Sequence, residues 1–184
     1  ADGIHSIVRK KLWGEDQARY TGNVAWRMLV PIEAISSKFL QQNTKVWLGT
    51  KNQFVEYLVK GGNFLNCVCL VEQNDWTNED WSEKGDISEL KHIFSDWHPE
   101  IQEILESTKP GSLFKWGLHD RAPMNKWSKG RFSLLGDAAH PMLPFVAQGA
   151  AMAIEDGIVL ASSLSSFKNV KLGLNDYENK RKYR

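Results

Sequence analysis

Apolar and polar residues alternate along four segments of the first 71 residues, a period of two that is typical of β-strands. These segments are rich in Val, Leu, Phe and Trp, which favour a pleated, half-buried surface. A Lys-Gly-Gly turn separates the last two, so we expect an antiparallel meander. The predicted strands cover residues 22–31, 45–49, 53–59 and 63–71, with the turn at 60–62.

The alternation in the third segment predicts two distinct faces. Gln53 and Tyr57 are four residues apart and therefore share a face with the intervening Val55, while Phe54 and Glu56 point to the other side of the sheet. We expect one face to line a site.

Later segments change to the helical period. His98-Pro99 is a typical helix start, and either Asp86 or Ser88 can cap the helix before it. The longest helix is apolar nearly all round, which predicts burial on most sides. The predicted helices cover residues 6–12, 87–97, a segment beginning at 98, 148–164 and 176–184, with further strands at 112–118 and 131–135.

Composition narrows the class of protein. The 184 residues are 42% hydrophobic and 24% charged, with a net charge of +1, so disorder, coiled coils and a general field for nucleic acid or membranes are all disfavoured. The two cysteines, Cys67 and Cys69, are too few for a disulfide framework or a zinc site. No apolar run of about 18 residues occurs, so no stable membrane insertion is expected and the cytoplasm is the predicted compartment.

Two features of composition leave alternatives open. Eight tryptophans and eight phenylalanines either fill a core and an interface or surround a planar ligand. Residues 72–106 contain eleven acidic side chains but only Lys84 and Lys91 as basic ones. This stretch is interpreted as solvated helices, with an acidic docking surface as the alternative.

The segment that carries chemistry is residues 130–157, GRFSLLGDAAHPMLPFVAQGAAMAIEDG. A short strand ends at Gly136, which puts Asp137 at its carboxyl end, where α/β folds bind ligands. A proline-stiffened loop then leads to a helix that opens with Gln148-Gly149-Ala150-Ala151. Small side chains and the positive end of the helix dipole suit a flat ligand that gains negative charge. A hydroxyl-binding acid beside such a helix start matches a flavin.

This run resembles the second flavin-contacting motif of the single-component, FAD-dependent aromatic hydroxylases. The opening residues 2–9, DGIHSIVR, resemble the Asp-Gly motif of the same family, and LPFVAQGAAMAIEDG is most similar to its salicylate hydroxylase branch. The AWR, WLG and EYLVKGG segments follow in the family's order, so the resemblance covers the whole chain.

The resemblance implies roles for particular residues. Asp137 would bind the ribityl hydroxyls, the peptide at Pro144 would lie beside the flavin ring, and the helix start would contact its pyrimidine edge. Asp2 and Arg9 would belong to the motif that serves both FAD and the nicotinamide donor. The alternatives are a helix or turn cap for Asp137, a surface ion pair for Arg9 and a structural hydrogen bond for His140. The implied cofactor-binding residues are Asp2, Arg9, Asp137, Pro144, Gln148, Gly149, Ala150 and Ala151, with no metal.

The same resemblance points to Gln53 and Tyr57 as the catalytic pair. Several relatives have a His at the start of this strand and a Tyr four residues on, whereas this chain has Gln53 in place of the His. An amide cannot act as a general base, so the substrate is already ionised, another group acts, or no base is used. The alternative is a polar pair on a half-buried sheet. Glu56 should face the opposite side.

No Gly-x-Gly-x-x-Gly fingerprint for the adenosine part of FAD occurs, and Gly61-Gly62 belongs to a hairpin turn. The chain is therefore interpreted as the carboxyl-side part of a longer enzyme that binds FAD weakly or not at all by itself. The expected fold is mixed α/β (α+β), an incomplete Rossmann-like FAD domain with an antiparallel-sheet substrate domain. The predicted segments are 1–20 and 119–184 for flavin and 21–118 for substrate.

The resemblance implies a monooxygenase that uses FAD, NADH or NADPH and O2. Oxygen adds to the reduced flavin as a hydroperoxide, and its distal atom passes to a small aromatic acid or phenol. A homodimer is left open. The alternatives are an FAD-dependent epoxidase or quinone-type hydroxylase, and a flavin-free binding module derived from the same fold.

Overall fold

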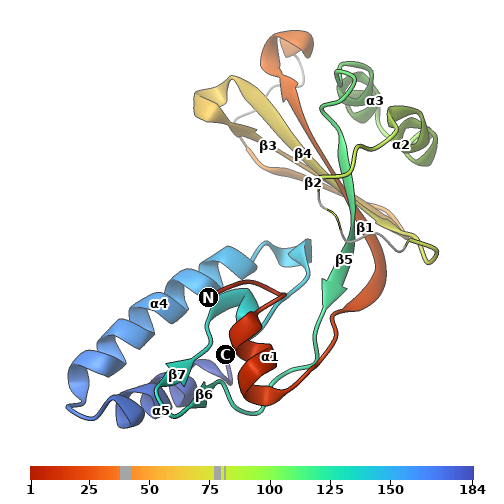
Figure 1. The fold of residues 1–184 in the computed structure, drawn as a ribbon. Coiled ribbons are helices and arrows are strands. Elements are labelled where there is room, and N and C mark those ends of the chain that lie inside the picture. The colour runs from red at the N-terminus through yellow and green to blue at the C-terminus, as the bar shows by residue number, and fades with distance from the viewer. Residues whose placement is uncertain (38–42, 77–79, 81) are drawn as a thin grey trace. The chain divides into compact units, whose positions relative to one another are not determined.

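The computed structural model describes residues 1–37, 43–76, 80 and 82–184. They form two compact units, which are described separately below (Figure 1). Unit 1 contains residues 1–19 and 119–184, and unit 2 contains residues 20–118. An antiparallel sheet combined with helices confirms the predicted mixed fold class.

Unit 2 is built on a five-stranded sheet with the order β2-β3-β4-β1-β5. The chain runs as an antiparallel meander from β2 to β4, but β1 then pairs with β4, so a simple meander in chain order is wrong. The apolar strand β4 lies at the centre of the sheet, where neighbouring strands form hydrogen bonds along both of its edges. The strands are β1 (Arg19–Pro31), β2 (Lys45–Leu48), β3 (Asn52–Val59), β4 (Phe64–Glu72) and β5 (Phe114–Asp120).

Helices α2 (Ile87–Ile93) and α3 (Pro99–Glu106) supply the apolar residues that pack on one face of this sheet (Figure 1). Of the two candidate caps, Asp86 is the one used, since its side chain accepts a hydrogen bond from the Ser88 N–H. Helix α3 starts at the predicted His98-Pro99, and the His98 side chain accepts from the Glu100 N–H. Helix α2 is shorter than predicted because Phe94 leaves the helical path and packs edge-on against Phe54 and Trp97 in the core.

The register confirms the two predicted faces of β3. Phe54 and Glu56 are buried on the side of α2 and α3, whereas Tyr57 is exposed. Directly paired residues share a face, so Tyr57 lies in a row with Asn66 of β4 and Leu29 of β1. We call this side, opposite the helices, the second face.

Unit 1 contains α1 (Ile7–Trp13), the short hairpin β6 (Ser128–Lys129) and β7 (Phe132–Ser133), and two long helices. Helix α4 (Gly149–Ser166) packs against α5 (Val170–Arg181) and against the turn Gly136–Ala138 (Figure 1). Among the described residues, no helix combines the length and the apolar character needed to cross a membrane.

Two predictions for these helices are wrong. Helix α4 is not buried on most sides, since the side chains of Ile154 and Ile158 are 65% and 66% exposed. Helix α5 begins at Val170 rather than at 176, because the Asn169 side chain caps its first turn and Gly173 allows close packing on α4. A Cβ atom at Gly173 would lie 3.1 Å from the carbonyl oxygen of Ser163.

Candidate functional site

A hollow of about 500 Å³ lies in unit 1, where the amino end of the chain meets two neighbouring segments from more than 130 positions later in the sequence. These two segments are the turn after Leu135 and the loop that leads into α4. The hollow is lined almost entirely by small or apolar side chains, and among the described residues that line it Asp137 has the one charged side chain. The lining residues are Ala1, Gly3, Leu135, Gly136, Asp137, Met142, Leu143, Pro144, Ala147, Gly149, Ala150 and Ala153.

Asp137 is available to a ligand. Its residue is exposed, and its carboxylate makes no hydrogen bond or ion pair with any residue that the structure describes. The 3-10 turn Gly136–Ala138 has no side-chain cap, so the alternative role of Asp137 as a cap is wrong. Strand β7 ends at Ser133, before the predicted end at Gly136, and Asp137 therefore lies within this turn.

The start of α4 offers backbone donors at the same hollow. The first intrahelical bond runs from the Met152 N–H to the Gln148 carbonyl, so the N–H groups of residues 149–151 have no helical acceptor. No acidic side chain occurs in the first turn, and the helix is 18 residues long. This end of α4 can therefore stabilise an anion or a carbonyl oxygen through its donors and its dipole.

A buried network holds the Asp137 turn in place. The Asp156 side chain of α4 is 0% exposed, and its Oδ2 accepts bonds from the Gly136 N–H at 2.8 Å and from His140 Nε2 at 2.6 Å. Its Oδ1 accepts from Arg181 Nε of α5 at 2.7 Å. Burial alone would raise the pKa of Asp156, but these donors outweigh it and lower the pKa.

Arg9 supports the turn from α1. Its guanidinium is buried and donates to the carbonyl oxygens of Ala138 and Ala139, at 3.2 and 3.3 Å, as well as to Asp16. The alternative of a surface ion pair is therefore wrong for Arg9. Asp2 accepts a bond from the Val8 N–H, and a side-chain hydrogen bond from Ser6 lowers the pKa of Asp2.

The structure thus brings together four of the eight predicted cofactor-binding residues as lining of one hollow, namely Asp137, Pro144, Gly149 and Ala150. Asp2, Gln148 and Ala151 adjoin lining residues in the chain without lining the hollow themselves. Sequence reasoning missed Asp156 and Arg181. The signal for Asp156 was a charged pair within an otherwise apolar helix, since a charge in such a place needs a buried partner.

Gln53 and Tyr57 belong to unit 2. They share the second face of the sheet, where Gln53 pairs with Leu70 and Tyr57 with Asn66. Gln53 is half-buried and Tyr57 is exposed. Glu56 is buried on the other face, as expected.

Gly136 provides a test of the turn geometry. Its φ is +59°, and a Cβ atom there would lie 3.2 Å from the Cβ of Ala153. We expect Gly136→Ala to destabilise unit 1 by about 1–2 kcal/mol, because L-residues disfavour this conformation and α4 would have to shift. Urea denaturation measures the change. Gly111 also has a positive φ but has open space around it, so Gly111→Ala is the control for the cost of the backbone conformation alone. An equal loss of stability in both variants would contradict the role of packing against α4.

Comparison with known proteins agrees with this geometry. Residues 1–184 match the family model described as an FAD binding domain. The chain belongs to the FAD-binding domain family. The relatives described next confirm the resemblance to FAD-dependent aromatic hydroxylases.

Two curated relatives of this FAD-binding chain are aromatic hydroxylases. A 6-hydroxynicotinate 3-monooxygenase of Pseudomonas fluorescens is 39% identical over 166 residues, which cover 89% of this chain and 42% of that protein. The 3-hydroxybenzoate 6-hydroxylase 2 of Aquipseudomonas alcaligenes is 34% identical over 165 residues, covering 89% of this chain and 50% of that protein. The chain thus spans half or less of the length of these relatives.

A solved structure gives the same result. The substrate complex of a salicylate hydroxylase matches with a TM-score of 0.85 and 28% sequence identity, covering 100% of this chain and 50% of that one. The FAD-binding chain is therefore similar in fold as well as in sequence to flavoprotein hydroxylases.

Proposed function

We propose that the complete protein is an FAD-dependent monooxygenase that hydroxylates a small aromatic acid or phenol with NADH or NADPH and O2. The observation that carries the proposal is the hollow in which an unpartnered Asp137 carboxylate and the start of α4 line one space. In this proposal unit 1 contributes to the flavin domain and unit 2 is the substrate domain.

The residues of the hollow fit FAD. A carboxylate with unused acceptor capacity suits the hydroxyls of the ribityl chain. The N–H groups at the start of α4 suit the oxygen and nitrogen edge of the flavin ring, and the helix dipole favours the negative charge of its reduced form. Gly149 and Ala150 have side chains small enough for a ring to reach the backbone. FAD supplies the redox chemistry when bound, taking electrons from a nicotinamide and activating O2.

The chain's own residues would bind and orient. Asp137 would fix the ribityl chain, and Pro144 would stiffen the loop beside the ring. Arg9 and Asp156 would keep the Gly136–Ala138 turn in place. In unit 2, the Tyr57 hydroxyl can donate to or accept from a substrate oxygen, whereas the Gln53 amide can orient a substrate but cannot take its proton.

Small aromatic substrates are supported by the relatives, whose names refer to hydroxynicotinate and hydroxybenzoate. Both compounds are planar rings that have a carboxylate and an oxygen substituent. Since the nicotinamide donor and the unbridged Cys67 and Cys69 belong to a reducing compartment, we propose the cytoplasm as the location. We propose a homodimer as the assembly, and light scattering of the complete enzyme tests this.

A product assay on the complete protein tests the reaction. We expect a yellow protein that hydroxylates salicylate-like or hydroxybenzoate-like acids and consumes NAD(P)H in proportion to product. Turnover of quinones or isoprenoids alone would replace this substrate class by that of the epoxidases and quinone hydroxylases. A well-folded but colourless protein would overturn the flavoenzyme proposal and support a binding module.

Asp137→Ala tests the flavin site directly. In the complete protein we expect FAD to bind at least about tenfold more weakly, because the hydroxyls lose a charged acceptor. The flavin content after gel filtration and the fluorescence titration of the apoprotein measure the loss. Asp96→Ala, an exposed acid in unit 2, should keep full occupancy. Unchanged FAD affinity in Asp137→Ala would remove Asp137 from the site.

A further inference from the structure

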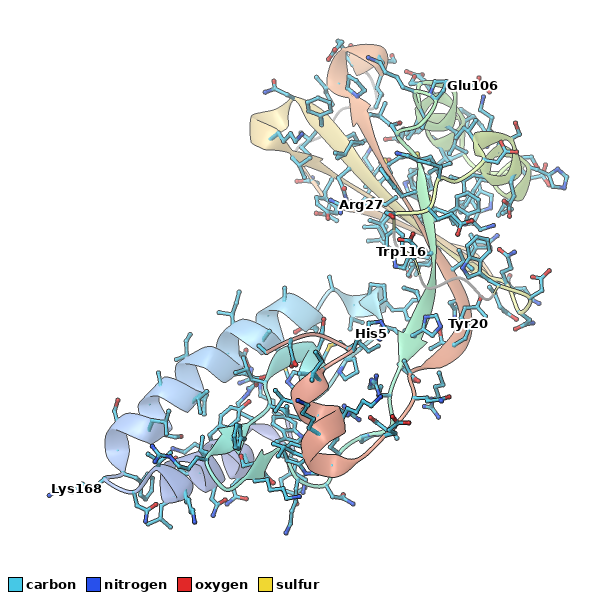
Figure 2. The ribbon with its side chains drawn as sticks, in the orientation of Figure 1. His5, Tyr20, Arg27, Glu106, Trp116 and Lys168 are labelled. Atoms are coloured by element: carbon cyan, nitrogen blue, oxygen red, sulfur yellow. The ribbon has the colours of Figure 1, made fainter. Side chains whose placement is uncertain are left out.

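Unit 2 has a cavity of its own, of about 530 Å³, on the second face of the sheet. Lys115 of β5 lies over the Trp26 ring on the helix-covered side, so its neighbours Phe114 and Trp116 point to the second face, as does Arg27 of β1. Figure 2 labels Arg27 and Trp116 on these two strands. The cavity is lined by Arg27, Leu29, Ser82, Ser112, Phe114 and Trp116, together with Met28.

Arg27 is the cavity's available charged group. Its Nε donates to Asn66 Oδ1 at 3.1 Å, while Nη1 and Nη2 make no hydrogen bond or ion pair with the described part of the chain. The two serine hydroxyls already donate their protons within the chain, Ser82 to Asp80 and Ser112 to the Lys109 carbonyl. None of the cavity's lining residues that the structure describes is acidic. A cation in such a place is poised for an anion from outside the chain.

Asn66 adds a second, independent indication. The residue is only 1% exposed, and its Oδ1 faces Arg27, which fixes the orientation of the amide. Its buried Nδ2 has no hydrogen-bond partner among the described residues. Asn66 does not itself line the cavity, and it acts on the site through Arg27. A buried donor without an acceptor costs free energy, so this costly amide is retained beside the one guanidinium that it orients. Asn66 pairs across the sheet with Tyr57.

We propose that Arg27 binds the carboxylate of an aromatic acid, with the ring against Phe114 and Trp116, and that Asn66 is a positioning residue that holds the guanidinium. This inference rests on the proposed function and deepens it, since it selects aromatic acids over neutral phenols. A guanidinium whose two NH2 groups are free matches a carboxylate in a bidentate way, and flat apolar walls match a ring.

The test is a titration of the complete protein with benzoate and with neutral benzamide. The indole N–H signal of Trp116, assigned by Trp116→Phe, reports binding in an NMR spectrum. We expect benzoate to bind with at least about tenfold higher affinity than benzamide, and Arg27→Gln to abolish this preference. Arg131→Gln, an exposed arginine of unit 1, is the matched control and should leave both affinities unchanged.

Asn66→Asp separates charge from folding. The new carboxylate would pair with Arg27 in place of the ligand, so benzoate should bind at least about tenfold more weakly while benzamide binds as before. Benzoate binding that survives both variants, or no benzoate signal at Trp116 in the unsubstituted chain, would overturn the inference. Either result leaves the flavin and product assays of the complete protein to decide the proposed function on their own.

Discussion

Replacing Asp156 with alanine is expected to lower the free energy of unfolding of unit 1 by about 2–4 kcal/mol, because the buried Arg181 guanidinium loses its fully buried carboxylate partner and keeps only the partly exposed Glu155, at 2.7 Å. The Arg181 side chain is 2% exposed and the Asp156 side chain is 0% exposed. The variant also removes the acceptor of the Gly136 N–H and of His140 Nε2. Urea denaturation measures the loss, and hydrogen exchange of residues 134–140 assigns it to the turn that contains Asp137.

Asp176→Ala is the matched control for this prediction. Asp176 also bonds across the α4–α5 contact, to Ser163, and it pairs with Lys180 at the surface. Its removal leaves no buried charge, so we expect a much smaller loss than for Asp156→Ala. The double change Asp156→Leu and Arg181→Met should recover only part of the stability, since apolar groups can replace a buried ion pair but not the acceptor of the Gly136 N–H and of His140. Equal losses in Asp156→Ala and Asp176→Ala would contradict the special role of the buried pair.

The network also affects the proposed cofactor site. Because Asp156 bonds to the residue that precedes Asp137, its loss should release the turn even in molecules that remain folded. In the complete protein, Asp156→Asn should therefore weaken FAD binding while most of the packing volume is retained. Normal FAD affinity together with increased exchange at Gly136 would limit Asp156 to a role in stability.

Local patterns were sufficient to predict much of this fold. The period of two in β3 predicts that Phe54 and Tyr57 lie on opposite faces, because successive side chains of a strand alternate between faces. Which of the two faces is buried did not follow from this period. The caps at Asp86 and His98 follow from side chains that bond to the next few backbone N–H groups. The order of the strands did not follow from such patterns, since the pairing of β1 with β4 depends on contacts about forty residues apart.

The candidate site divides in the same way. Asp137, Gly149 and Ala150 could be predicted because motif and chain order place them near each other. The supports of the turn could not, because Arg9 meets the Ala138 carbonyl across 129 positions of sequence and Arg181 meets Asp156 across 25. Such pairs form only when whole helices and turns pack together, and a short stretch of sequence does not contain the information about that packing. The sequence can predict that a buried charge needs a partner, but it does not predict which residue that partner is.

A second buried cluster of charges lies under the sheet of unit 2. Glu56 of β3 is 2% exposed and faces Glu100 of α3, with Lys45 of β2 between them. Lys45 Nζ is 3.5 Å from Glu56 Oε1 and also pairs with Glu100. Burial, together with the neighbouring Glu100, raises the pKa of Glu56 from 4.5 to about 7, against the attraction of Lys45. Cys67 and Cys69 are the other titratable groups beside it, and burial keeps their thiols protonated.

The raised pKa makes the stability of unit 2 depend on pH in a stated direction. Between about pH 4.5 and 7 the folded state holds a proton on Glu56 that the unfolded state has released, so the free energy of unfolding falls as pH rises. Over this pH range the free energy of unfolding falls by about 3 kcal/mol in total, and below pH 4.5 Glu56 causes no such loss. We expect Glu56→Gln, which keeps the shape without the charge, to remove this slope and to be more stable than the original chain at pH 8.

Urea denaturation at several pH values between 4 and 8 measures both effects, with Glu72→Gln as the control. Glu72 pairs with Lys51 at the surface of the same sheet, so its amide should leave the slope unchanged. If Glu56→Gln and the original chain lost stability in parallel over this range, the proton would belong to another group. If Glu56→Gln were less stable at pH 8, the attraction of Lys45 would outweigh both burial and the repulsion from Glu100, and Glu56 would be charged in the folded protein at neutral pH.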